Sequence, residues 1–105
     1  AMLLVCSKGV IGESYCIGGF GEKTNKYVLS RICTIMDELR PKNKSYLNLI
    51  TSVKDRLGHD RRYAINSSKI QNDLGWQPSV EFDEGLKLTI EWYLKNSDWL
   101  YQNSN

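Results

Sequence analysis

The sequence predicts a small α/β or α+β domain, with three or four helices and a few short strands. Two segments carry apolar residues at the spacing of an amphipathic helix, and three short runs alternate apolar and polar side chains as strands do. Because helical and strand-like segments are interspersed along the chain, a mixed architecture is favoured over an all-helical one. A chain of 105 residues is one domain at most, and with so few short strands it is expected to be part of a domain.

The first 25 residues predict a helix end, a strand and a turn. Residues 1–9, AMLLVCSKG, have the apolar run, the lysine and the final glycine of a helix C-terminus, so we expect other residues to precede them. Residues 12–18, GESYCIG, alternate as a strand does. A glycine-rich turn follows, and Thr24 or Asn25 is expected to cap the next helix.

That next helix is predicted from one stripe of apolar residues, Val28, Ile32, Ile35, Met36 and Leu39. It should end at Arg40, because a basic side chain suits the C-terminal dipole and Pro41 cannot continue the helix. A polar loop leads to a short predicted strand at 50–54, ITSVK, and a charged loop leads to another at 62–66, RYAIN.

The last third of the chain predicts two helices. Ser67 or Ser68 is expected to cap a short helix, KIQNDLG, that ends at Gly75. Asp83 is expected to cap the final helix. The apolar face of that helix is made by Leu86, Ile90, Tyr93 and Leu94.

Composition and charge exclude several classes of protein. A net charge of +2 gives no reason to expect a nucleic-acid or membrane partner, and no apolar run approaches the length of a membrane span. The three cysteines are odd in number and lack Cys-x-x-Cys spacing, which predicts reduced thiols in a cytoplasmic protein. With one histidine, no metal site is expected.

The glycine-rich stretch YCIGGFGEKTN, residues 15–25, raises the question of a phosphate-binding loop. A P-loop requires glycine directly before its lysine, but Glu22 stands there, and its charge would repel phosphate. The dinucleotide fingerprint fails as well, since Thr24 replaces its third glycine. We therefore interpret the stretch as a strand and a turn, and predict no cofactor-binding residue in it.

The loop KDRLGHDRRY, residues 54–63, concentrates the groups that could bind a ligand. Arg56, Arg61 and Arg62 offer guanidinium groups that can bind phosphate through two parallel hydrogen bonds, and His59 could donate to a phosphate or a sugar hydroxyl. A solvated charged surface and a nucleic-acid patch are the alternatives. Although His59 and Asp60 are adjacent, no nucleophile accompanies them, so we predict no catalytic residue.

Several of these motifs together resemble one enzyme family. The segments YCIGG, EKTN, MDEL, DRLGHDRRYAIN, LGW-x-P and TIEWYL are similar to the C-terminal portion of the dTDP-glucose 4,6-dehydratases, which are extended short-chain dehydrogenases acting on nucleotide sugars. The resemblance runs from about residue 1 to about residue 100. It implies that residues 1–105 form a C-terminal substrate-binding domain and that the N-terminal NAD-binding Rossmann domain is not part of this chain.

The resemblance also implies roles for three residues. Arg56 would grip the diphosphate of the substrate, and His59 would contact its phosphate or ribose region. Cys16 stands where the family usually has an asparagine that binds the substrate, and a thiol is a weaker hydrogen-bonding group. Leu57 replaces the usual proline of the arginine loop, which implies that Arg56 is less firmly held before binding.

The implied activity belongs to a larger protein. The family oxidises the sugar C4 hydroxyl with NAD, eliminates water across C5 and C6, and returns the hydride to C6. This chain has neither the glycine fingerprint nor a Tyr-x-x-x-Lys pair, so we expect it to bind no NAD and to be inactive alone. The resemblance further implies a dTDP-sugar substrate and a homodimeric parent. A related UDP-sugar epimerase or decarboxylase, and an independent binding module, are the alternatives.

Overall fold

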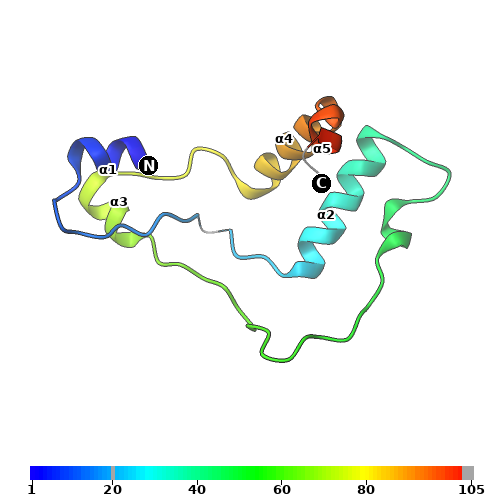
Figure 1. Ribbon diagram of the computed structural model, residues 1–105, viewed down its shortest axis with the longest axis horizontal. Coiled ribbons are helices and arrows are strands. Elements are labelled where there is room, and N and C mark those ends of the chain that lie inside the picture. Colours follow the sequence, from blue (N-terminus) through cyan, green and yellow to red (C-terminus); the bar gives the residue numbers. More distant parts are fainter. Residues whose placement is uncertain (20, 103–105) are drawn as a thin grey trace. The chain divides into compact units, whose positions relative to one another are not determined.

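The computed structural model describes residues 1–19 and 21–102. In this part of the chain the secondary structure is helical (Figure 1). The elements are α1 (Met2–Lys8), α2 (Asn25–Leu39), the 3-10 helix η1 (Tyr46–Leu49), α3 (Ser68–Leu74), α4 (Phe82–Lys95) and α5 (Ser97–Gln102). None of the described helices is both long enough and apolar enough to cross a membrane.

The chain divides into two compact units. The first, called the α1–α3 unit, contains the described residues of 1–22 and 56–79. The second, called the α2–α4 unit, contains the described residues of 23–55 and 80–105. Each unit has one fully buried apolar side chain among the described residues, Ile70 in the first and Ile35 in the second.

In the α1–α3 unit, α1 packs against α3. The predicted helix end at residues 1–9 is confirmed by α1, which ends at Gly9 with the backbone extended. A side chain is excluded at Gly9, because a Cβ atom there would lie 2.5 Å from the carbonyl oxygen of Val5. The predicted end of α3 at Gly75 is also confirmed: Gly75 is left-handed (φ 70°), and its N–H donates to the carbonyl of Gln71 at 2.9 Å.

The predicted serine cap of α3 is confirmed in its position, Ser67, but not in its capping hydrogen bond. Ser67 occupies the N-cap position, but its side chain makes no capping hydrogen bond. The side-chain oxygen of Asn66 instead accepts from the backbone N–H of Ser68 at 2.9 Å. Ser67 is buried, and its hydroxyl accepts from the side-chain amide of Gln71 at 3.0 Å. The Ser67 hydroxyl therefore bonds to the Gln71 side chain and not to a backbone N–H of the first turn, as a capping serine would.

In the α2–α4 unit, the predicted stripe on α2 is confirmed. Its five apolar side chains are buried or half-buried, and α2 packs against both η1 and α4. The predicted cap at Thr24 is confirmed too, because its hydroxyl oxygen accepts from the backbone N–H of Tyr27 at 3.2 Å. The helix ends at Leu39, directly before Arg40 and Pro41, as expected.

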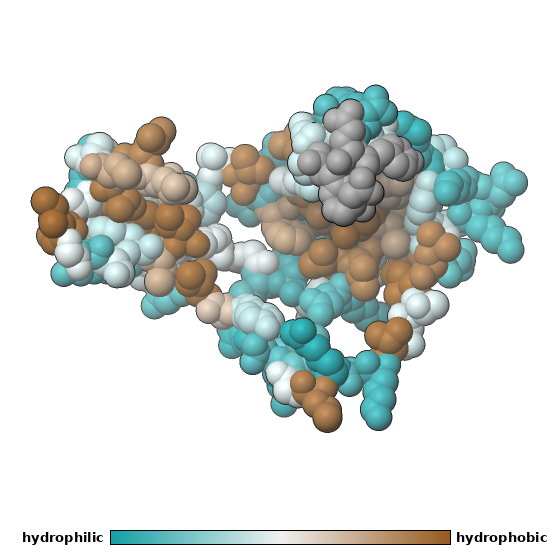
Figure 2. Space-filling view, viewed as in Figure 1, coloured by the Kyte–Doolittle hydropathy of each residue, from teal (hydrophilic) through white to brown (hydrophobic). Residues whose placement is uncertain are grey.

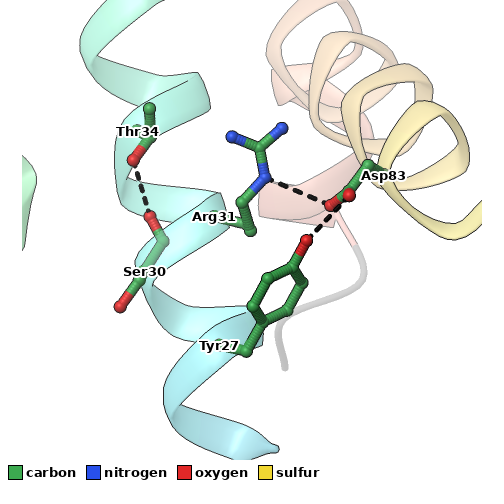
Figure 3. Close-up of polar contacts among 5 residues, drawn as sticks. All are labelled: Tyr27, Ser30, Arg31, Thr34 and Asp83. Atoms are coloured by element: carbon green, nitrogen blue, oxygen red, sulfur yellow. Dashed lines mark hydrogen bonds and ion pairs between the residues drawn. The ribbon is translucent and has the colours of Figure 1, made fainter. Parts of the chain in front are cut away.

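The predicted cap of the final helix at Asp83 is wrong. Helix α4 begins at Phe82, so Asp83 lies within its first turn. The Asp83 carboxylate accepts from the Tyr27 hydroxyl at 2.8 Å and from Nε of Arg31 at 3.1 Å (Figure 3). The Asp83 carboxylate thus bonds to two side chains of α2 and does not cap its own helix. It joins α2 and α4, the two main helices of the unit.

The same contacts perturb the protonation of Asp83 and Tyr27. The hydrogen bond from Tyr27, followed by Arg31, lowers the pKa of the Asp83 carboxyl below its usual 3.8. The Asp83 carboxylate in turn raises the pKa of the Tyr27 hydroxyl above 10.0. Stability from Asp83 is therefore present above its unfolded pKa and lost as the pH falls through the folded pKa. Stability from Tyr27 is present below pH 10 and lost as the pH rises through its own folded pKa.

This linkage predicts the pH dependence of the variant Asp83→Asn. Its melting temperature is expected to lie a few degrees below that of the natural chain at pH 7, because a neutral amide pairs less well with Arg31. The difference should begin to shrink as the pH falls below the usual carboxyl pKa, and it should disappear once the pH is below the lowered folded pKa of Asp83, where the carboxyl itself is neutral. Thermal unfolding, monitored by circular dichroism between pH 3 and pH 7, measures the difference in melting temperature and its change with pH. A gap that stays constant across this range would contradict the assignment.

The sequence did not predict η1 or α5. Within the expected polar loop, η1 forms because Asp37 accepts from the Ser45 hydroxyl at 2.5 Å and from the backbone N–H of Tyr46 at 2.9 Å. Helix α4 ends where the side-chain amide of Asn96 donates to the carbonyl of Trp92 at 2.8 Å, and α5 begins directly afterwards.

The three predicted strands, at 12–18, 50–54 and 62–66, are not formed as paired strands in the described part of the chain. These segments lack the ladder of hydrogen bonds that defines a sheet. A strand requires a neighbouring strand to accept its backbone hydrogen bonds, and alternation of side chains alone does not supply one. The helical part of the predicted fold class is thus confirmed, whereas its sheet is not.

Large apolar side chains lie at the surface of both units. Figure 2 shows them as brown atoms in contact with solvent. Ile11 and Leu57 are fully exposed, and Leu3 and Val53 are 86% exposed. A soluble domain usually buries most side chains of this size, so two fully buried apolar residues among those described form a very small core.

Candidate functional site

The charged loop forms a sharp turn in the α1–α3 unit. The backbone N–H of His59 donates to the carbonyl of Arg56 at 3.4 Å, and Gly58 between them is left-handed, with φ 72°. A side chain would be strained at that φ, so glycine suits the turn. The turn places Arg56 and His59, both exposed, at its two ends. Two residues that the sequence singled out for ligand binding are thereby brought together.

Tyr63 connects this turn to the residues after it. Its hydroxyl donates to the carboxylate of Asp60 at 2.7 Å. This bond is the main cause that raises the pKa of Tyr63 above 10.0, while a hydrogen bond with the Arg56 side chain lowers it by a smaller amount. The phenol oxygen thus contacts a carboxylate of the same loop. Sequence reasoning missed Tyr63, because no local motif marks a tyrosine that hydrogen-bonds to a carboxylate of its own loop.

Arg62 forms an ion pair with Glu22. Its Nε and Nη2 atoms donate to one carboxylate oxygen of Glu22, at 2.9 Å and 2.6 Å. The guanidinium therefore holds the end of the glycine-rich stretch against the loop. Both side chains are largely exposed, so this ion pair contributes about 0.2 to 1 kcal/mol to stability. The same contact leaves the negative charge of Glu22 directly before Lys23, where a P-loop would have glycine.

Cys16 lies on a segment that passes beside the loop's C-terminal end. Its thiol is free and exposed. Gly18, two residues further on, packs so closely against Ile65 that a Cβ atom at Gly18 would lie 2.1 Å from a methyl carbon of Ile65. The structure thus places Cys16 on a neighbouring segment of the same unit, whereas Arg56 and His59 share one turn.

This close approach makes Gly18→Ala a sensitive test. The added methyl group must displace Ile65, which is expected to lower the free energy of unfolding by about 1 to 3 kcal/mol. Gly19→Ala is the matched control, because its Cβ would meet only the ring of Pro78 at an ordinary 3.6 Å. Urea unfolding of both variants compares them. Equal stabilities would show that the two segments are not in close contact.

A second set of contacts fixes α3 beside the first segment. Lys69 forms an ion pair with Glu13, and its ammonium lies 5.1 Å from the centre of the Tyr15 ring. The Tyr15 hydroxyl accepts from the backbone N–H of Val10 at 3.3 Å. The bond with Glu13 raises the pKa of Lys69, and Lys69 lowers the pKa of Glu13. These contacts hold the segment that carries Cys16 against the helix that follows the loop.

Comparison with known proteins places this arrangement in a family. A family model described as GDP-mannose 4,6 dehydratase matches residues 1–89. The chain belongs to this family. The matched residues include the turn of Arg56 and His59 and the segment of Cys16. The family resemblance drawn from the sequence motifs is therefore confirmed.

Within the family, the chain is similar to dTDP-glucose 4,6-dehydratases. It is 50% identical over 100 residues to the enzyme of Shigella flexneri, covering 95% of this chain and 28% of the relative. It is 52% identical over 101 residues to the enzyme of Haemophilus influenzae, covering 92% and 30%. The chain thus spans less than a third of the length of these curated relatives.

A solved structure of the same kind is also similar. The crystal structure of dTDP-glucose 4,6-dehydratase from Bacillus anthracis in complex with NAD is 43% identical, with a TM-score of 0.77. The match covers 93% of this chain and 29% of that one. Family membership does not test the roles of Arg56, His59 and Cys16, which stay predictions.

Proposed function

We propose that this chain is the substrate-binding part of a dTDP-glucose 4,6-dehydratase. The observation that carries the proposal is the identity of about half of its residues, over 95% of its length, with enzymes of that name. The complete protein would convert dTDP-glucose to dTDP-4-keto-6-deoxyglucose. This chain would contribute the grip on the nucleotide diphosphate, and the redox and elimination steps would belong to the rest of the protein.

The turn at Arg56 has the chemistry that a diphosphate requires. A guanidinium offers paired N–H donors that match two phosphate oxygens, and it keeps its positive charge at any physiological pH. His59 at the other end of the turn can donate one further hydrogen bond. Both side chains are exposed, so a ligand could reach them. We propose Arg56 as the phosphate anchor, His59 as a contact to phosphate or ribose, and Cys16 as a weak contact to the substrate.

NAD is proposed as the cofactor of the complete protein, since the solved relative from Bacillus anthracis is in complex with NAD. The residues of this chain do not fit a dinucleotide site. In its glycine-rich stretch, Thr24 stands where the dinucleotide fingerprint has its third glycine, and the nearby Glu22 carboxylate is held by Arg62. We therefore assign no NAD contact to the described residues.

The exposed apolar surface supports a place within a larger protein. Ile17, Val53 and Ile65 lie on the three extended segments, and each is at least 42% exposed. We propose that these segments pair as strands with other parts of the complete protein, which would bury such side chains and complete the α/β fold. Burial would be favourable by about 25 cal/mol for each Å² of apolar surface removed from water.

Nucleotide specificity tests the proposal. The complete protein that carries this chain should bind dTDP-glucose, as measured by calorimetry, in preference to UDP-glucose and GDP-mannose. It should also form the 4-keto-6-deoxy product, which NMR spectroscopy detects. Preference for a UDP-sugar without formation of this product would favour the epimerase or decarboxylase alternative. The homodimeric state and the cytoplasmic location of the complete protein stay predictions, and light scattering checks the first.

A further inference from the structure

The proposed ligand contacts lie on two segments of the α1–α3 unit that are far apart in the sequence. Cys16 lies on the first segment, the described residues of 12–22, and Arg56 and His59 lie on the second, residues 56–66. A substrate that contacts both segments binds more tightly when their spacing is fixed beforehand, because ordering them on binding costs free energy. Contacts between the two segments therefore bear on the affinity for the substrate.

Two contacts join these segments. Gly18 packs against Ile65 so closely that a Cβ atom at Gly18 has no room. In addition, Nε and Nη2 of Arg62 donate to one carboxylate oxygen of Glu22, at 2.9 Å and 2.6 Å. We call the ion pair of Glu22 and Arg62 the clasp. Glu22 follows Gly18 whereas Arg62 precedes Ile65, so the two segments pass each other in opposite directions.

The clasp lies between the proposed ligand contacts along both segments. Cys16 is six residues before Glu22, and His59 is three residues before Arg62. The turn itself is weakly restrained, because its closing hydrogen bond, from the backbone N–H of His59 to the carbonyl of Arg56, is long at 3.4 Å. A contact that holds the chain just after this turn therefore limits where the turn can move.

We propose that Glu22 and Arg62 are positioning residues, whose clasp holds the Cys16 segment and the Arg56 turn at the spacing that the substrate requires. The proposal rests on the function proposed above, because it assumes that these two segments bind a dTDP-sugar. Neither residue of the clasp needs to touch the ligand. The Glu22 carboxylate engages the Arg62 guanidinium, which then serves as a tie and not as a phosphate donor.

The direction of the effect of Glu22→Gln separates this role from a direct phosphate contact. If the clasp positions the two segments, loss of the carboxylate should weaken substrate binding. If Arg62 instead binds phosphate directly, the same change should strengthen binding, because it releases the guanidinium and removes a negative charge from the neighbourhood of the ligand. The two roles thus predict opposite signs for one substitution.

The test is a double-mutant cycle in the complete protein, with dTDP-glucose as the ligand and calorimetry as the measurement. Glu22→Gln and Arg62→Gln are each expected to weaken binding about twofold to fivefold, the size of effect that one exposed ion pair allows. The double variant should bind no more weakly than either single variant, because each change alone already opens the clasp. The KM should rise while kcat stays unchanged, since the clasp acts on binding alone.

Glu38→Gln is the matched control. It breaks an ion pair with Lys87, 4.0 Å long, that lies in the α2–α4 unit. The Glu38 side chain is 58% exposed and that of Glu22 is 49% exposed, so the two changes remove similar carboxylates. All of these variants should fold, because the side chains are at the surface. Glu38→Gln should change neither the affinity nor the KM.

Each contrary outcome has a distinct meaning. Tighter binding by Glu22→Gln would overturn the proposal and assign Arg62 to the phosphate. Unchanged affinity in Glu22→Gln, with weak binding by Arg56→Ala, would overturn it and leave the proposed function intact. An equal loss in Glu38→Gln would overturn it as well, because the effect would not depend on the clasp. Failure of the natural protein to bind dTDP-glucose would remove the proposed function, and the role of the clasp with it.

Discussion

Replacement of Arg56 by alanine is expected to weaken dTDP-glucose binding to the complete protein by about 10- to 150-fold. A hydrogen bond to a charged group typically contributes about 1.5 to 3 kcal/mol, which corresponds to that range. Arg56 begins a tight turn and is exposed, so a ligand can reach its guanidinium. Calorimetric titration gives the affinity directly.

Two further variants show whether charge or geometry carries the effect. Arg56→Lys keeps the charge but loses the paired donors, so its affinity should lie between those of the natural protein and the alanine variant. Arg61→Ala is the matched control, since it removes an equal charge from the same exposed loop. A loss of equal size in Arg61→Ala would show that the loop attracts phosphate by its overall charge, and Arg56 would no longer be the anchor.

Replacement of Ile70 by alanine is expected to lower the free energy of unfolding of the α1–α3 unit by about 2 to 5 kcal/mol. Ile70 is completely buried, and it is the one fully buried apolar side chain in the described part of that unit. The described part of this unit has no other fully buried apolar side chain that could move to fill the cavity left by the substitution. Small domains are stable by only a few kcal/mol, so the change should be enough to open the unit.

Hydrogen exchange measures this effect element by element. Amides of α1 and α3 should exchange much faster in Ile70→Ala, because the contact between the two helices depends on that side chain. Ile11→Ala is the control, since Ile11 is fully exposed and its loss should change stability by about 0.5 kcal/mol or less. Equal protection in the two variants would mean that Ile70 does not hold the unit together.

Local sequence signals predicted the helices well and the strands poorly. The apolar stripe on α2, the cap at Thr24 and the glycine after α3 depend only on residues within a few positions of one another, so they are visible in the sequence. A strand depends on a partner that can come from anywhere. The three alternating segments form neither helix nor paired strand in the described chain, and no local pattern reveals which residues would pair with them.

Long-range contacts also explain where predictions at single residues failed. Asp83 has the residue type of a cap, but it lies in the first turn of α4, and Tyr27 and Arg31, more than 50 positions earlier, bind its carboxylate. Glu22 and Arg62 are 40 positions apart, so their ion pair was invisible in the sequence. For the site, the loop and its arginine could be identified from composition and motif. The hydrogen bond from the Tyr63 hydroxyl to Asp60 became visible only in the structure.

The aromatic side chains at the junction of α4 and α5 give the protein an internal optical signal. The Trp92 ring lies 5.2 Å from that of Tyr93 and 5.4 Å from that of Trp99, nearly edge-on in both cases. Rings this close couple their electronic transitions, which should produce a distinctive near-ultraviolet circular dichroism band. Since Trp76, the remaining tryptophan, lies in the other unit, this band reports on α4 and α5 specifically. Spectroscopy can therefore follow the two units separately without any introduced label.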